Sequence, residues 1–201
     1  MIRLASSFSW ISRDARLIIL ARGMRTFAQS FDAIIIALYL GELGFSLVQV
    51  GVFLTVGVAG VSFFALLVGL LAVMVGLRRF LVFFSLTSAG AAIAISMVDD
   101  FRLLLAIAFL GSLANGGGVG AESPTQPLEV VGLAGTTALE KRTDLFAIYA
   151  IVARTGAFLG ALAAGVPVLF QDIFGLSTAH SLRAMFLGFA GCQLIGALLF
   201  H

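Results

Sequence analysis

Two charged side chains lie within long apolar stretches of this sequence, where an unpaired charge is costly. Asp32 falls in the stretch 23–43, and Arg154 falls in the stretch 145–170. A charge at the centre of a membrane helix costs about 2.5–3.5 kcal/mol, so each needs a partner or a water-filled cavity. Counted from the same end of their helices, both lie about 10–15 Å deep. We therefore expect Asp32 and Arg154 to face each other, either as a packing bridge or as the lining of a transport path.

Asp32 belongs to a polar stripe on its predicted helix. At about 100° per residue, the members of this stripe fall within about a third of the helix circumference. They are Arg22, Arg25, Gln29, Asp32 and Tyr39. Such a stripe on an otherwise apolar helix faces protein or water, although Arg22 and Arg25 could also extend to the membrane surface. The candidate residues of a substrate or ion pathway are Gln29, Asp32, Tyr39 and Arg154.

The composition indicates the class of protein that carries these residues. The chain has 61% hydrophobic and 11% charged residues and a mean hydropathy of +1.14, whereas soluble domains carry about 25% charged residues. A helix needs about 20 apolar residues to cross the hydrocarbon core, and its backbone groups must be satisfied within the segment. The sequence therefore predicts an all-α integral membrane protein whose surroundings are a lipid bilayer.

Six apolar segments approach the length of a bilayer span. We place them at 23–43, 48–73, 80–98, 102–121, 145–170 and 182–200. The whole chain, 1–201, is then a single polytopic bundle of six transmembrane helices. Residues 1–22 form a cytoplasmic lead or interfacial segment, and residues 122–144 form a cytoplasmic loop between the fourth and fifth helices.

The positive charges predict how this bundle is oriented. Nine of them fall on the side of the N-terminus and of the loops after the second and fourth helices, and two fall on the other side. The positive-inside rule then places both termini in the cytoplasm of a multi-pass protein of the cell membrane. Because these basic residues lie between apolar segments and not on one exposed face, we expect no nucleic-acid partner.

The sequence carries no arrangement of residues that suggests catalysis. A single cysteine, Cys192, excludes an internal disulfide and a metal site built from cysteines. The two histidines, His180 and His201, lie in a loop and at the chain end, and the GxSxG and HExxH motifs are absent from the sequence. We expect a protein that is not an enzyme and that needs no cofactor and no metal.

A GxxxG motif in the fifth apolar segment predicts a close helix contact. Gly156 and Gly160 are four residues apart and would lie on one face of a helix. Small residues let two helix backbones approach closely, either between two chains or within one bundle. We favour packing within the bundle.

Two short motifs carry a resemblance to a known family. The stretch 69–79 reads GLLAVMVGLRR, and the stretch 141–149 reads KRTDLFAIY. The first is similar to the loop between helices two and three of the major facilitator superfamily, with Gly69, Gly76, Arg78 and Arg79 at matching positions and Val73 at the position of the family's aspartate. The second is similar to the entry into helix five of bacterial members. With its six predicted spans, the chain resembles the N-terminal six-helix half of such a transporter.

The resemblance implies an architecture and a function. Family members have twelve helices in two halves, with the substrate bound between the halves at mid-membrane. We therefore expect secondary active or facilitative transport of a small solute by alternating access, with proton or sodium as candidate coupling ions. The chain would supply one half, and a second six-helix half or a homodimer mate would supply the other.

A different class of function also fits the sequence. The chain could be a non-transporting six-helix scaffold or subunit of a membrane assembly, and a membrane enzyme is the third and weakest alternative. A carrier predicts that Gln29 is open to water, whereas a scaffold predicts that packing seals it. The accessibility of a cysteine at position 29 would separate the two.

Overall fold

The computed structural model describes residues 10–75, 77–112, 126–175 and 177–199, and within these the chain is helical without strands. The predicted all-α class is therefore confirmed for the described residues. The helices are α2 (Arg13–Glu42), α3 (Leu47–Val75), α4 (Leu77–Met97), α5 (Phe101–Gly111), α6 (Gln126–Gly135), the short 3₁₀ helix η1 (Leu139–Lys141), α7 (Arg142–Ala163), α8 (Val166–Phe174) and α9 (Thr178–Leu199).

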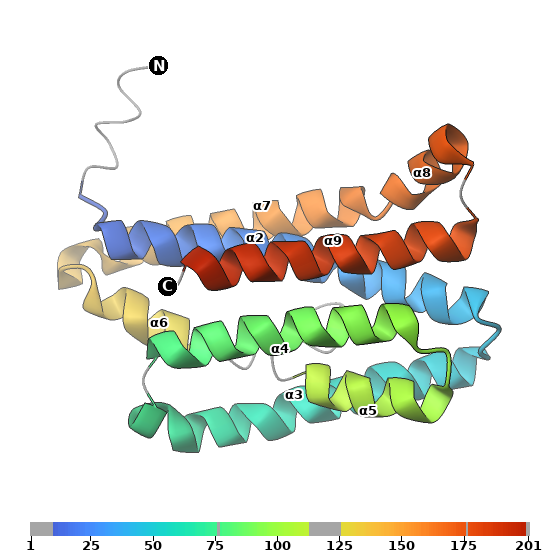
Figure 1. Cartoon of the computed structure of the whole chain (residues 1–201). Helices are drawn as coiled ribbons and strands as arrows, with labels where there is room; N and C mark the ends of the chain where they lie inside the picture. Colours follow the sequence, from blue (N-terminus) through green and yellow to red (C-terminus); the bar gives the residue numbers. More distant parts are fainter. Residues whose placement is uncertain (1–9, 76, 113–125, 176, 200–201) are drawn as a thin grey trace.

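The long helices run alongside one another and alternate in direction (Figure 1). The start of α2, the junction of α3 with α4, the connection of α6 with α7 and the end of α9 lie at one end of the bundle, and the α2–α3, α4–α5 and α8–α9 connections lie at the opposite end. Helix α2 packs mainly on α7 and α9, α4 packs on α9 and α5, and α3 packs on α5. The contact of α4 with α9 therefore joins the group formed by α2, α7 and α9 to the group formed by α3, α4 and α5.

Short polar residues fix where the helices begin. The Ser12 side chain caps α2 by accepting a hydrogen bond from the Ala15 amide at 3.2 Å. The Asp100 carboxylate caps α5 by accepting from the amides of Arg102 and Leu103 at 2.9 and 3.1 Å. Such caps satisfy amides that have no partner inside the helix. The sequence Asp99-Asp100, expected to mark a loop, thus determines the start of α5.

Two aromatic and aliphatic clusters hold α2 in place. In the larger, Phe31 and Tyr39 of α2 meet Phe189 and Phe186 of α9 edge-on, with ring centroids 5.9 and 5.2 Å apart. In the smaller cluster, buried residues near the start of α2 pack on α6 and α7. They are Ile11, Ala15, Ile19, Leu133, Leu145 and Tyr149.

The GxxxG prediction is confirmed as packing within the chain. A Cβ atom on Gly156 would lie 2.5 Å from the Gly23 carbonyl oxygen, and one on Gly160 would collide with the Phe27 backbone. Helices α2 and α7 therefore touch backbone to backbone. The order of the contacts, 23 with 156 and 27 with 160, also shows that the two helices run parallel.

The helices differ from the predicted segments in two places. Helix α2 begins at Arg13, so residues 13–22 of the predicted lead continue the first helix, and one face of these turns packs on α6 and α7. The predicted loop 122–144 contains α6, whose Leu133 is fully buried. Packing of Leu133, which is fully buried, and of the half-buried Val130 stabilises this short helix, whereas Val131 is exposed.

The fourth and fifth predicted spans also differ in detail from the helices. Helix α5 covers 11 residues and ends at Gly111, and most of the remaining predicted span, to 121, lies outside the described residues. The fifth span divides at Ala164–Gly165 into α7 and α8. Pro167 stands in the first turn of α8, where a missing amide hydrogen costs nothing.

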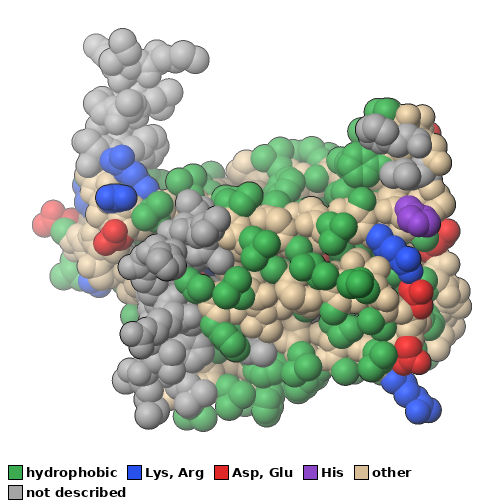
Figure 2. Space-filling view, viewed as in Figure 1, with side chains coloured by type: hydrophobic (Ala, Val, Ile, Leu, Met, Phe, Trp, Pro, Cys, Tyr) green, Lys and Arg blue, Asp and Glu red, His purple; other side chains and the backbone are tan. Residues whose placement is uncertain are grey.

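The outside of the bundle is apolar. In the face shown in Figure 2, hydrophobic side chains cover the middle and charged side chains gather at the two ends. Two helical stretches of the described residues, Leu47–Leu70 and Leu139–Ile173, are long and apolar enough to cross a membrane. Val82–Met97 and Phe101–Gly111 are apolar but shorter. These features are those of a membrane protein.

Candidate functional site

Asp32 borders a cavity between the helices. The cavity has a volume of about 60 Å³ and is lined by residues of α2, α3, α4 and α5. Because one water needs about 10–15 Å³, it has room for a few water molecules or a small ion. Its polar lining comes from Gln29, Asp32 and Ser112, and the rest is apolar or glycine.

Close helix contacts form the walls of this cavity. A Cβ atom on Gly111 of α5 would lie 2.7 Å from the Ala91 Cβ of α4, and one on Gly60 of α3 would collide with Ser112. Helices α3 and α4 are thus both held tightly on α5. The Ser112 hydroxyl is already used, since it donates to the Phe109 carbonyl oxygen at 2.5 Å.

Asp32 has no cation to neutralise it within the described part of the chain. None of the ion pairs there includes its carboxylate, and no lysine or arginine lines the cavity. A carboxylate between apolar walls is costly unless something compensates its charge. Water, a proton or a cation in the cavity would do so.

Gln29 lies one turn before Asp32 on the same face of α2. Its Nε2 atom is buried and has no hydrogen-bond partner among the described residues. A buried amide nitrogen without a partner is uncommon in proteins and calls for an explanation such as a functional role or a bound water or ion. The structure thus brings the predicted pathway residues Gln29 and Asp32 together at one cavity.

Arg154 does not belong to this site, and the predicted pair with Asp32 is wrong. Arg154 is exposed on α7, and no described residue of α7 lines the cavity. Gly23 lies against both Val152 and Gly156, so Arg154 is level with Gly23. Asp32 is nine residues further along α2 (32 − 23 = 9), or about 13 Å.

The rotation of α2 is the physical reason for this separation. Phe27 presents its backbone to α7. Asp32 follows five residues later, which turns it about 140° away from that contact at 100° per residue. Neither the relative depth of the two charges nor this rotation was predictable from the sequence, because both depend on which residues of α2 and α7 touch.

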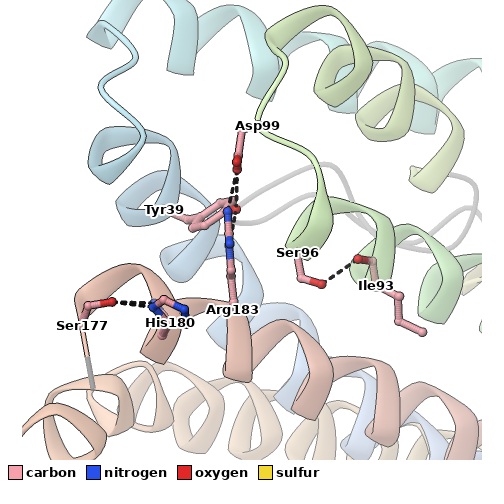
Figure 3. A network of polar contacts seen from close by, with 7 residues as sticks. All are labelled: Tyr39, Ile93, Ser96, Asp99, Ser177, His180 and Arg183. Carbon is pink, nitrogen blue, oxygen red and sulfur yellow. Dashed lines mark hydrogen bonds and ion pairs between the residues drawn. The ribbon is translucent and has the colours of Figure 1, made fainter. Parts of the chain in front are cut away.

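Tyr39, the remaining pathway candidate, lies in a separate polar network (Figure 3). Arg183 of α9 donates from Nε to the Tyr39 hydroxyl at 3.1 Å and from Nη2 to Asp99 Oδ1 at 2.7 Å. The Tyr39 hydroxyl donates to the same Asp99 oxygen at 3.3 Å. The network joins α2, α9 and the connection that precedes α5, at the end of the bundle where the sequence predicts few positive charges.

Two residues of this network were missed by the sequence analysis. Asp99 lies between the third and fourth predicted spans, and Arg183 lies near the start of the last one. Neither was predicted to belong to a site, although they carry opposite charges on the same predicted side of the membrane. Tyr39 is fully buried and holds the network in place. Nearby, but apart from it, the Ser177 hydroxyl and His180 Nδ1 are 2.7 Å apart (Figure 3).

A second polar cluster lies near the other end of α2. Arg25 forms an ion pair with Glu129 of α6, and the Tyr149 hydroxyl of α7 donates to Glu129 Oε2 at 2.9 Å. Arg22 donates from Nη2 to Gln126 Oε1 at 3.1 Å. Arg22 and Arg25 are 9% and 8% exposed, so both side chains are buried in the bundle.

The residues of the predicted motif between the second and third spans are only partly described. Gly69 lies on the exposed side of α3. Gly76 lies outside the described residues, and Arg78 and Arg79 form the first turn of α4. The motif therefore coincides with the junction of α3 and α4.

Comparison with known proteins supports membrane association. No family model matches the chain, and no solved structure matches it. The chain is 25% identical over 198 residues to the uncharacterized membrane protein YJR124C of Saccharomyces cerevisiae, and the match covers 96% of this chain. It spans 44% of the length of that relative. Together with the apolar helices, this similarity indicates an all-helical membrane protein.

Proposed function

We propose that this chain is one half of a carrier that moves a small solute across a membrane by alternating access. The observation that carries the proposal is the cavity at Asp32, where a carboxylate and a Gln29 amide nitrogen, both without a partner among the described residues, meet inside an apolar bundle. An ionisable residue within a membrane bundle marks a substrate or ion path by default.

The order of helix contacts supports a half of the major facilitator type. The helices α2, α3 and α4 can be taken as one repeat and α5, α7 and α9 as a second, so that α2 corresponds to α5, α3 to α7 and α4 to α9. Exchanging the two repeats then converts the α2–α7 contact into the α5–α3 contact. It leaves the α4–α9 contact unchanged. Such internal repeats of three helices build each half of these carriers. These corresponding contacts support the proposed architecture.

Arg154 supports the existence of a second half. It is exposed on α7, within the stretch Leu139–Ile173 that is long enough to cross a membrane. Such a charge facing lipid costs about 2.5–3.5 kcal/mol, so this face of α7 should meet water or another protein surface. More than half of the S. cerevisiae relative lies outside the match, which leaves room for a second bundle in that protein.

We further propose six crossing helices with both termini in the cytoplasm of a cell membrane. The nine-to-two division of positive charges supports this orientation. The start of α2 and the end of α9 lie at the same end of the bundle, which is consistent with an even number of membrane crossings (Figure 1). A second half from the same polypeptide, or a second copy of this chain, would complete the path.

Cysteine labelling tests the proposal without knowledge of the solute. Gln29→Cys is made in a Cys192→Ala background and treated with a membrane-impermeant maleimide in oriented vesicles. A carrier predicts labelling from one side, because the cavity must open to water there. Ala28→Cys is the matched control, since Ala28 is fully buried in the packed core and should stay unlabelled. If position 29 resists labelling from both sides, as position 28 does, the chain is a sealed scaffold and the carrier proposal is wrong.

A further inference from the structure

Arg22 is the centre of a buried cluster whose charges do not balance. The cluster, at the contact of α2 with α6 and α7, contains two guanidinium groups and one carboxylate. Its members are Arg22, Arg25, Gln126, Glu129 and Tyr149. None of them lines the cavity at Asp32, which lies ten residues, or about 15 Å, further along α2. The cluster is therefore a separate feature of the molecule.

The contacts of the single carboxylate are with residues other than Arg22. One oxygen of Glu129 pairs with Arg25, and the other accepts the hydroxyl hydrogen of Tyr149 at 2.9 Å. Glu129 is 1% exposed, so water does not share it. The charge of Arg25 is compensated, and that of Arg22 is not.

Within the described residues, the direct contacts of the Arg22 guanidinium group are with neutral groups. Its Nη2 donates to Gln126, and its Cζ lies 5.4 Å from the centre of the Tyr149 ring. The ring covers a face of the guanidinium group, whereas the N–H bonds point outward in its plane. Nε and Nη1 are buried and have no hydrogen-bond partner within the described residues. Three N–H bonds are thus unused, one on Nε and two on Nη1.

We propose that Arg22 binds the phosphate group of an anionic ligand. A phosphate oxygen accepts from a planar guanidinium fork and supplies the missing negative charge, which no neutral ligand would do. The site lies at the end of the bundle where the sequence gathers its positive charges and where helices that cross a membrane would meet the headgroups. A lipid headgroup and free inorganic phosphate carry the same chemistry, and the experiment below separates them. The proposal is independent of whether the chain transports a solute.

The test measures the thermal unfolding midpoint of the purified full chain in nanodiscs of phosphatidylcholine. One arm titrates inorganic phosphate against sodium chloride of equal ionic strength, and the other replaces part of the lipid with phosphatidylglycerol. We expect a saturable rise of the midpoint in at least one arm. A rise with phosphate alone identifies a soluble anion, and a rise with phosphatidylglycerol alone identifies a lipid headgroup. No rise in either arm overturns the proposal.

Variants tie the response to Arg22. Arg22→Gln should abolish the rise, whereas Arg102→Gln, at an exposed arginine near the opposite end, should keep it. If Arg22→Gln fails to fold, Arg22→Lys serves instead, because it keeps the charge and loses the planar fork. We expect Arg22→Lys to need at least tenfold more ligand for half of the effect. An unchanged titration in Arg22→Gln or Arg22→Lys overturns the assignment.

Discussion

Gly156 of α7 lies so close to Gly23 of α2 that a Cβ atom on Gly156 would be 2.5 Å from the Gly23 carbonyl oxygen. Gly160 makes the same kind of contact with Phe27 one turn later. These contacts set the distance and the rotation between the two helices, and through them the positions of Asp32 and Arg154. The arrangement leads to the following predictions.

Gly156→Ala should destabilise the bundle by about 1–3 kcal/mol, because the added methyl group forces α2 away from α7. The measurement is the thermal unfolding midpoint in detergent. Gly188→Ala is the matched control, since Gly188 lies in α9 with open space where its Cβ would be. If Gly156→Ala unfolds at or above the midpoint of Gly188→Ala, the backbone contact is not as close as described.

Asp32→Asn should stabilise the folded chain by about 0.5–2 kcal/mol, the gain commonly found when a destabilising functional group is removed. The physical reason is that the carboxylate has no cationic partner at its cavity in the described residues. Arg154→Gln should leave stability nearly unchanged, because Arg154 is exposed. Equal losses of stability in both variants, recovered in the double variant, would revive the ion pair that the structure separates.

Glu129→Gln should destabilise the chain by about 3–5 kcal/mol, because it leaves Arg25 buried without its counter-charge. The control is Glu140→Gln, which removes the same charge from an exposed position before α7. A double-mutant cycle with Arg25→Gln measures the coupling of the pair. A coupling free energy below about 0.5 kcal/mol would show that the two charges act independently.

Reporter fusions should place Asp99 outside the cell and Thr137 in the cytoplasm. The expectation rests on the nine-to-two distribution of positive charges, which favours the N-terminal side as the inner one. The measurement is the activity of a reporter enzyme that works only outside the cell and is fused after each of the two positions in turn. A cytoplasmic signal at Asp99, or an external one at Thr137, would reverse the orientation.

The helical structure and the close helix contact at Gly156 and Gly160 could be predicted from the sequence, because both depend on the local sequence. Long apolar stretches in this chain can only satisfy their backbone as helices, and Gly156 and Gly160 are spaced to share a face. The grouping of Gln29 with Asp32 followed from the same periodicity, since the two are neighbours on one helix.

The remaining features depend on contacts between distant segments, which one sequence does not reveal. Glu129 lies in a polar stretch with two prolines nearby, and only the burial of α6 against α2 makes it a partner of Arg25. Tyr39 was expected beside Asp32, but Arg183, 144 residues later, holds its hydroxyl at the end of the bundle. We expected Arg154 to point into the bundle, but α7 packs on α2 in a way that leaves Arg154 exposed.

The pairing of the first long helix with α7 has a consequence for biosynthesis. Gly156 is translated 133 residues after Gly23 (156 − 23 = 133), which takes about 7–27 s at about 5–20 residues per second. During that interval α2 has neither its main partner nor α9, although it carries four arginines, two aspartates and a glutamate. A nascent chain of this protein therefore has to keep its most polar helix in a protected environment until its later helices have been made. Chaperones or insertases that shield polar helices should be needed most at this stage.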